Sequence, residues 1–91
     1  MIRAEHLDPV DARVLVAIAL HRREHGEGPA WHVIAKAAGW EQSHELPERL
    51  HRLRNSGLVA FTAERRSIRL RPGALELALE RLRMRDEERV A

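Results

Sequence analysis

Leucines repeat along residues 46–53 at the i, i+4 and i+7 spacing that places them on one face of a helix. The triplet Asn-Ser-Gly at 55–57 then ends the helix, because glycine accepts the left-handed backbone of a helix C-terminus. Two short runs with alternating side chains follow, 58–61 and 67–70, on either side of a turn at 64–66. The sequence therefore predicts a helix that leads directly into a two-stranded hairpin.

The positive charge of the chain collects on this same helix and hairpin. Residues 49–71 contain seven arginines and one acid, Glu64, for a net charge of +6. Residues 1–48 carry a net charge of −3 and residues 72–91 carry −1, so the whole chain carries only +2. This concentration of cations is expected for a nucleic-acid contact surface. A solvated cationic surface without a ligand is the plainer alternative.

The composition narrows the class of protein. The 91 residues fit a single domain, 1–91, and a content of 44% hydrophobic and 33% charged residues is typical of a globular chain. No apolar run approaches the roughly 18 residues that cross a bilayer, so we expect no membrane contact. The absence of cysteine excludes disulfides and thiolate metal sites, and it agrees with a cytoplasmic protein.

Two helices are expected before the leucine-rich helix. The pair Asp8-Pro9 is a strong helix start, and this first helix should run to about residue 24. A second helix opens after Gly28-Pro29 and closes at Gly39, with Trp31 expected in the core. Residues 1–7 show no periodicity, and we expect either a tail or an extension packed on the body.

Two further boundaries follow from proline and glycine. Pro47 is tolerated only in the first turn of a helix, so the third helix should begin between residues 43 and 46. After the hairpin, Arg71-Pro72-Gly73 leads into a last helix over about 74–88. The inner face of this last helix is expected to consist of Leu75, Ala78, Leu79 and Leu82.

Three motifs within this order are similar to those of a known family. They are IAKAAGW at 34–40, LHRLRNSGLV at 50–59 and IRLRPGAL at 68–75. Together they resemble the winged helix-turn-helix proteins, most closely the small bacterial transcriptional regulators of MarR and PadR type. The resemblance implies a mainly α fold with a small β-hairpin, in the order helix 1, helix 2, turn, helix 3, two-stranded wing, helix 4. It also implies a protein that binds double-stranded DNA.

The resemblance further implies which residues contact DNA. The third helix of such proteins enters the major groove, where glutamine can bind adenine and arginine can bind guanine through two atoms. Arginines of the wing contact the minor groove or the backbone. The residues implied for DNA contact are Gln42, Ser43, His44, Arg49 and Arg52 near the third helix and Arg65, Arg66 and Arg69 of the wing.

Two acids of the third helix point to a different partner. Glu45 and Glu48 are expected on the outward side of this helix, where a carboxylate repels phosphates. They favour an alternative function, a winged-helix module that binds a protein partner with little or no specific DNA binding.

The histidines supply the best candidate for a metal site. His21 and His25 have the i, i+4 spacing that can bind zinc from one helix face. However, His21 lies on the core stripe, and His25 lies at the helix end, where histidine also stabilises the helix dipole. No nucleophile motif and no glycine-rich phosphate loop is present. We therefore expect no metal, no cofactor and no enzymatic activity.

A second apolar line on the last helix predicts a homodimer. Leu77 and Met84 are seven residues apart and are expected nearly opposite the inner face. Together with Val16 and Leu20 of the first helix they would be buried by a second copy of the chain. A dimer would also space two recognition helices by about 34 Å, one turn of the duplex. Two tolerated apolar surface residues are the alternative.

Overall fold

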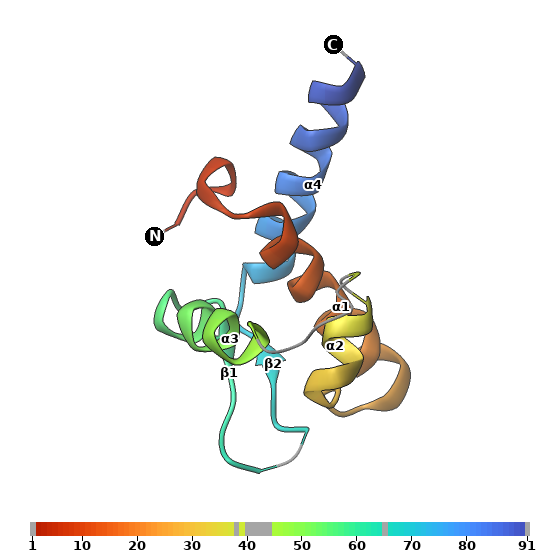
Figure 1. The fold of residues 1–91 in the computed structure, drawn as a ribbon, viewed down its shortest axis with the longest axis vertical. Coiled ribbons are helices and arrows are strands. Elements are labelled where there is room, and N and C mark those ends of the chain that lie inside the picture. Colours follow the sequence, from red (N-terminus) through yellow and green to blue (C-terminus); the bar gives the residue numbers. More distant parts are fainter. Residues whose placement is uncertain (1, 38, 40–44, 65, 91) are drawn as a thin grey trace.

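A computed structural model describes residues 2–37, 39, 45–64 and 66–90, and within them the protein is mainly helical with one small antiparallel sheet. None of the helices in these ranges is long and apolar enough to cross a membrane. Figure 1 shows helix α4 extending away from the body at one end and the hairpin at the opposite end. The elements in chain order are η1 (Ala4–His6), α1 (Pro9–His25), α2 (Trp31–Ala37), α3 (Leu46–Asn55), β1 (Val59–Ala60), β2 (Arg69–Leu70) and α4 (Ala74–Val90).

Helix α1 is the central helix of the fold, and it begins where its sequence predicts. Asp8 Oδ1 accepts a hydrogen bond from the Val10 amide at 2.7 Å, and Pro9 occupies the first helical position. The helix ends at His25, close to the predicted residue 24. It packs along α4 and also contacts α2 and β2, so it joins both ends of the molecule.

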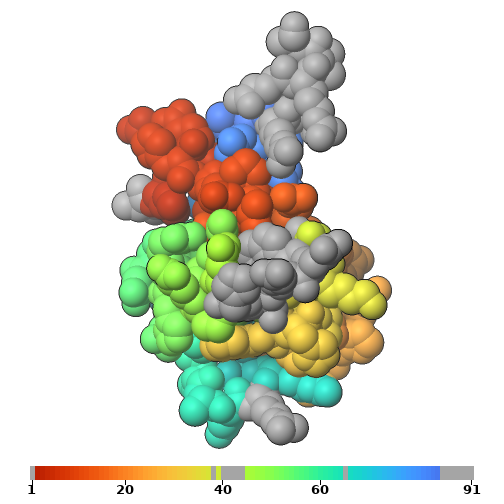
Figure 2. All heavy atoms as spheres, viewed as in Figure 1, coloured from red at the N-terminus to blue at the C-terminus, as the bar shows by residue number. Residues whose placement is uncertain are grey.

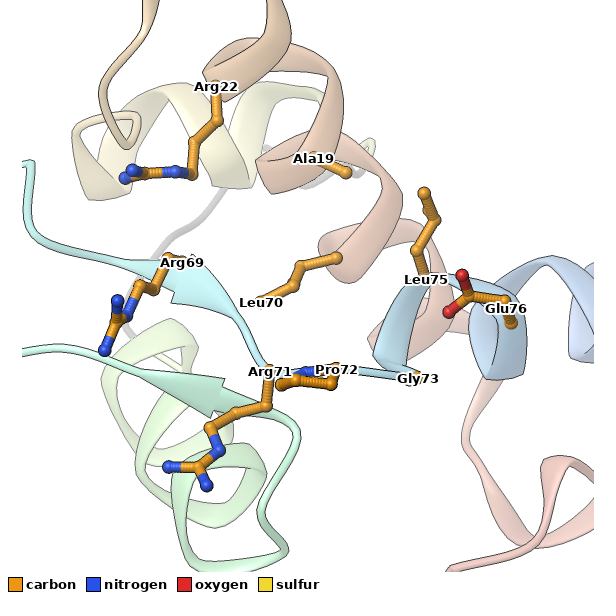
Figure 3. Close-up of a pocket in the computed structure, with 9 residues that line it drawn as sticks. All are labelled: Ala19, Arg22, Arg69, Leu70, Arg71, Pro72, Gly73, Leu75 and Glu76. Atoms are coloured by element: carbon orange, nitrogen blue, oxygen red, sulfur yellow. The ribbon is translucent and has the colours of Figure 1, made fainter.

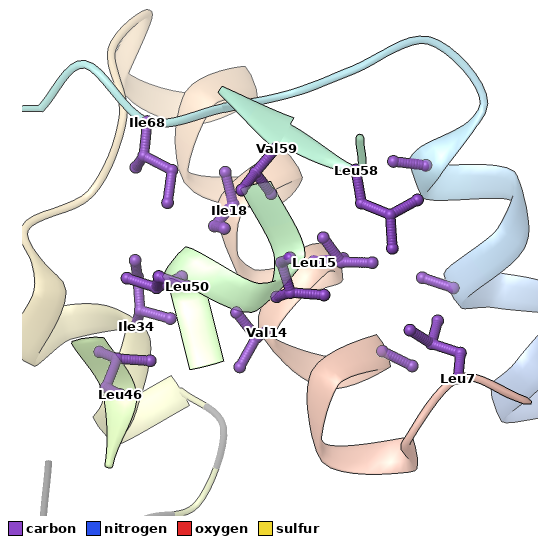
Figure 4. Close-up of a cluster of buried hydrophobic side chains, with 14 of the residues drawn as sticks. Leu7, Val14, Leu15, Ile18, Ile34, Leu46, Leu50, Leu58, Val59 and Ile68 are labelled. Atoms are coloured by element: carbon purple, nitrogen blue, oxygen red, sulfur yellow. The ribbon is translucent and has the colours of Figure 1, made fainter. Parts of the chain in front are cut away.

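The hydrophobic core lies between α1, α2, α3 and the hairpin, as Figure 4 shows. The leucines of α3 at positions 46, 50 and 53 are at most 2% exposed, which confirms the predicted leucine face. One side of α3 is therefore occupied by the core, and only the other side can contact a ligand. The leucines share the core with Val14, Leu15, Ile18, Ile34, Leu58, Val59 and Ile68.

The ladder of the hairpin is shorter than its two alternating runs predict. It contains two residue pairs, beginning with Val59 opposite Leu70. Next to it, the Ser67 hydroxyl accepts a hydrogen bond from the Thr62 amide at 2.9 Å and donates one to the Thr62 carbonyl at 3.2 Å. A side chain thus satisfies backbone groups that a longer ladder would pair, and the strands end early.

A third backbone segment lies against the hairpin at Gly28. The Gly28 amide donates a hydrogen bond to the Arg66 carbonyl at 3.0 Å. A Cβ atom at position 28 would lie 2.3 Å from the Ile68 carbonyl oxygen and 2.8 Å from that of Arg66. Because only glycine permits this approach, the connection between α1 and α2 is fixed directly on the hairpin.

Helix α4 turns to the core a face that agrees only in part with the predicted one, since Ala78 and Leu82 contribute to it and Leu79 does not. Ala74 and Ala78 are 1% and 0% exposed, whereas Leu79 is 51% exposed. Leu77 and Leu82 pack against the core, so Leu77 does not lie opposite the inner face. Small buried side chains allow close packing of neighbouring helices, and here Ala74 and Ala78 are the most deeply buried residues of the inner face.

The residues before α1 form an extension that packs on the body. Ala4 and Leu7 are 6% and 3% exposed. Arg81 of α4 donates a hydrogen bond from Nε to the Leu7 carbonyl at 2.9 Å. Of the two arrangements expected for this segment, the packed extension is confirmed for residues 2–7 and the free tail is wrong.

Candidate nucleic-acid interface

Ion pairs join one side of α3 to the first turn of α1. The Arg49 guanidinium lies 3.0 Å from Asp11 Oδ1 and 3.6 Å from Asp8 Oδ2. Arg52 approaches the second carboxylate oxygen of Asp11 at 3.5 Å. The Asp11 side chain is only 7% exposed and lies at the centre of this group. We call these four residues the Asp11 cluster.

The Asp11 cluster holds Arg49 more firmly than Arg52. Desolvation alone would lower the pKa of Arg49, but the hydrogen bond to Asp11 and the charges of Asp11 and Asp8 outweigh it, and this pKa is raised. The Arg49 side chain is 20% exposed, whereas that of Arg52 is 55% exposed. Arg49 therefore serves to bind α3 to α1 in this structure, and Arg52 still has a solvent-accessible guanidinium.

The arginines of the hairpin differ in whether they form ion pairs within the protein. Arg66 forms an ion pair with Glu27, while its carbonyl accepts the hydrogen bond from Gly28. Its φ of 59° lies in the left-handed region that turns favour. Arg69 and Arg71 are exposed, and within the described residues neither forms an ion pair. These two remain available to an external anion.

A hollow of about 460 Å³ lies at the base of the hairpin, between α1 and the start of α4 (Figure 3). The guanidiniums of Arg22, Arg69 and Arg71 lie on the side of this hollow toward the hairpin loop. The Glu76 carboxylate lies on the opposite side. Arg22 donates a hydrogen bond to the Ile68 carbonyl at 3.2 Å, which fixes its position. We call these three arginines the outer flank, and Arg22 is a member that the sequence did not indicate.

A larger groove of about 800 Å³ lies between the hairpin, α3 and the start of α2. Figure 2 shows the hairpin at one end of the molecule, next to these two helices. Arg54, Arg66, His32 and His51 supply the cationic and ionisable groups of its lining, and Glu64 is the one carboxylate among the described lining residues. We call this site the hairpin groove, and within the described residues its Arg54 forms no ion pair, so this guanidinium can bind an anionic group.

Three aromatic rings meet in the hairpin groove. The ring centroids of Trp31 and Phe61 are 5.7 Å apart, those of His51 and Phe61 are 5.3 Å apart, and those of Trp31 and His51 are 6.5 Å apart. Each pair meets edge to face, and the Arg54 guanidinium lies 4.5 Å from the centre of the Phe61 ring. Trp31 is 37% exposed, so its expected place in the core is wrong.

The predicted contact residues do not form one continuous surface. Arg49 and Arg52 face the first turn of α1, Arg66 lines the hairpin groove, and Arg69 belongs to the outer flank. The remaining predicted contacts lie outside the described residues, and they are Gln42, Ser43, His44 and Arg65.

The sequence also missed residues that the structure brings to the site. Arg54 and Arg71 belong to the same run of arginines but were not among the predicted contacts. Arg54 follows His51 by three residues, a spacing at which helical side chains meet, and its NH2 group lies 3.0 Å from His51 Nδ1. No local pattern indicates that Trp31 and Phe61, thirty positions apart, share one groove.

The residues predicted for a dimer interface are only partly available. Val16 and Leu77 pack against the core, Met84 is half-buried, and Leu20 is 55% exposed. On α1 and the described side chains of α4, the large apolar residues left exposed are Leu20 and Leu79. The homodimer stays a prediction, and of its four predicted interface residues Leu20 is the most exposed.

The histidine pair considered for a metal site is close in space. The ring centroids of His21 and His25 are 4.3 Å apart. Within the described residues, no group of three or more histidine, cysteine, aspartate or glutamate side chains is arranged to hold a metal ion.

Together these features define a small helical domain with an arginine-rich hairpin beside α3. Comparison of the chain with protein-family models, with curated proteins and with solved structures finds no match. Its function must follow from the geometry and charge of its own residues.

Proposed function

We propose that the protein is a winged helix-turn-helix transcriptional regulator that binds duplex DNA through the exposed side of α3 and the hairpin. The order of the elements supports this proposal, because α3 follows α2 and runs directly into the hairpin. The hairpin is also held by the segment before α2, since the Gly28 amide donates a hydrogen bond to the Arg66 carbonyl. A helix flanked by a hairpin is suited to enter a major groove while the hairpin reaches the neighbouring backbone.

The observation that carries the proposal is the positive charge that remains after the internal ion pairs. Asp8, Asp11 and Glu27 each pair with an arginine of residues 49–71. Residues 49–71 contain seven arginines, and these three acids together with Glu64 supply four carboxylates. The residues 49–71 and their three acidic partners therefore carry a net charge of +3. Because phosphate neutralisation dominates affinity for nucleic acid, this excess is available to a DNA backbone.

The outward side of α3 carries less positive charge than the hairpin. Steps of 100° from the leucine face place Glu48 and Asn55 opposite the core, with His51 and Arg52 beside them. Asparagine can bind adenine through two atoms, and glutamate can accept a hydrogen bond from cytosine. We therefore assign base contacts to α3 and phosphate contacts to the outer flank and to Arg54.

Replacing both Arg69 and Arg71 with alanine should weaken binding to all duplexes alike. Each arginine that contacts a phosphate contributes about one unit to the salt dependence, so the slope of log Kd against log salt should fall by about two. Fluorescence anisotropy with a labelled duplex over a series of salt concentrations measures both effects.

A matched control removes the same charge elsewhere. Arg3→Ala with Arg13→Ala changes two exposed arginines of the N-terminal part of the chain, and the slope should stay nearly unchanged. Wild-type protein without measurable affinity for duplex DNA even at low salt would refute the proposed function.

Asp11→Asn should tighten DNA binding although it destabilises the fold. The amide keeps the shape of the side chain but removes the charge that holds Arg52, so the Arg52 guanidinium becomes available to phosphates, whereas Arg49 keeps its pair with Asp8. The free energy of unfolding should fall by about 1–3 kcal/mol. Glu5→Gln makes the same change in net charge at an exposed site, and it should alter the affinity for DNA and the free energy of unfolding less than Asp11→Asn does. Weaker DNA binding by folded Asp11→Asn protein would contradict the competition between Asp11 and phosphate.

The internal ion pairs also favour one alternative, a module that binds a protein partner. Arg49, Arg52 and Arg66 are each paired with a carboxylate of the same chain, which reduces what they offer to phosphates. A stoichiometric protein partner that is retained after Arg69 and Arg71 are replaced, together with absent DNA binding, would support this alternative.

A further inference from the structure

The aromatic rings of the hairpin groove are not explained by binding to duplex phosphates. Phosphates require donors and positive charge, which the arginines supply. Trp31 nevertheless leaves 37% of its surface exposed in this groove, beside Phe61 and His51. The three rings meet edge to face and do not stack on one another. An aromatic surface is thus present that a planar ligand can use.

Two arginines, Arg54 and Arg66, line the groove together with these rings. The Arg54 NH2 group is within hydrogen-bond distance of His51 Nδ1, at 3.0 Å. This contact and the Phe61 ring hold the Arg54 guanidinium in place, while its other N–H groups form no hydrogen bond within the part of the chain that the structure describes. Arg66 lines the same groove, and its side chain is 55% exposed despite its pair with Glu27.

We propose that the hairpin groove binds an unpaired nucleotide of a nucleic-acid strand, with the base against Trp31 and the phosphate at Arg54 and Arg66. This inference rests on the proposed function and names the kind of DNA that the site prefers, a duplex next to a single-stranded segment. Proteins that bind single strands combine aromatic surfaces for the bases with cations for the backbone, and the hairpin groove has both.

We propose an unpaired nucleotide because only an unpaired base has a face that is free to stack on an aromatic side chain. Within a duplex each base is stacked on its neighbours, and only its edges are accessible in the grooves. An unpaired base has a free face that can stack on an aromatic side chain. The groove of about 800 Å³ is large enough, since pockets for small ligands measure roughly 300–1,000 Å³.

The test compares a blunt duplex with the same duplex carrying a short single-stranded overhang. Fluorescence anisotropy measures the Kd of each for the wild type, Trp31→Ala and Trp31→Phe. For the wild type the overhang should tighten binding on the order of 10- to 100-fold, the effect of one stacked base. Trp31→Ala should lose this gain and keep its affinity for the blunt duplex, whereas Trp31→Phe should retain part of the gain. Circular dichroism and thermal melting show that each variant is folded.

The outcomes separate this inference from the proposed function. Wild-type protein that binds the blunt duplex but gains nothing from the overhang overturns the inference and leaves duplex binding intact. Equal losses for both DNAs in folded Trp31→Ala protein also overturn it, because Trp31 would then only support the packing of the hairpin. Binding of neither DNA refutes the proposed function itself.

Discussion

Leu53→Ala should lower the free energy of unfolding by about 2–5 kcal/mol, with a fall in Tm of at least roughly 8 °C for a domain of this size. The Leu53 side chain is 2% exposed and belongs to the core cluster at the end of α3. Its truncation removes buried apolar surface and leaves a cavity that the neighbouring side chains fill only in part. Thermal and denaturant unfolding followed by circular dichroism measure the change, and DNA binding should be lost only as far as the protein unfolds.

The matched control for this change is Leu79→Ala. It removes the same atoms from a side chain that is 51% exposed on α4. A surface substitution of this kind usually changes stability by less than about 0.5 kcal/mol. If Leu53→Ala lowers the free energy of unfolding no more than Leu79→Ala does, the leucine face of α3 is not part of the hydrophobic core of this protein.

Gly28→Ala should have the second largest effect, a loss of about 1–3 kcal/mol or somewhat more. The added methyl group would meet the carbonyl oxygens of Ile68 and Arg66, which belong to the backbone and cannot rotate away. Either the connection between α1 and α2 or the hairpin must therefore shift. Because Arg66 also lines the hairpin groove, binding of nucleic acid should weaken in the folded fraction as well.

Glu27→Ala is the control for Gly28→Ala. It removes the neighbouring ion pair to Arg66 without adding an atom to the contact between the two backbones. The pair is about half exposed, and exposed pairs contribute roughly 0–1 kcal/mol. A Gly28→Ala protein that melts like the wild type would show that the close contact at Gly28 is absent in solution.

The boundaries of the helices are predictable because they depend on residues close together in the chain. The cap at Asp8 and the turn restrictions of Pro9 act within a few residues. The same holds at Gly57, whose φ of 78° lies in the left-handed region and follows the end of α3. The face of α4 was predicted in part: Ala78 and Leu82 contribute to the core as predicted, whereas Leu79 is exposed, since leucines occur on several sides of this helix and the sequence does not show which side meets α1.

The sequence predicts which region of the chain forms the candidate site, but it does not predict how the side chains of that site are arranged in space. The run of arginines in residues 49–71 is visible in the sequence, yet Asp11, which binds Arg49, precedes it by 38 positions. The pairing of Arg66 with Glu27 spans 39 positions. Such pairs depend on how the helices pack, which no local spacing reveals.

The sequence alone determined the mainly helical elements, the leucine face of α3 and the excess of arginine on α3 and the hairpin, because these properties depend on spacing and composition along the chain. Only the tertiary structure decided which arginines are neutralised by the Asp11 cluster and Glu27, and which remain exposed on the two sides of the hairpin. The physical reason is distance: an ion pair or ring contact acts over a few ångströms, and residues far apart in the chain reach that range only after the core has brought their helices together.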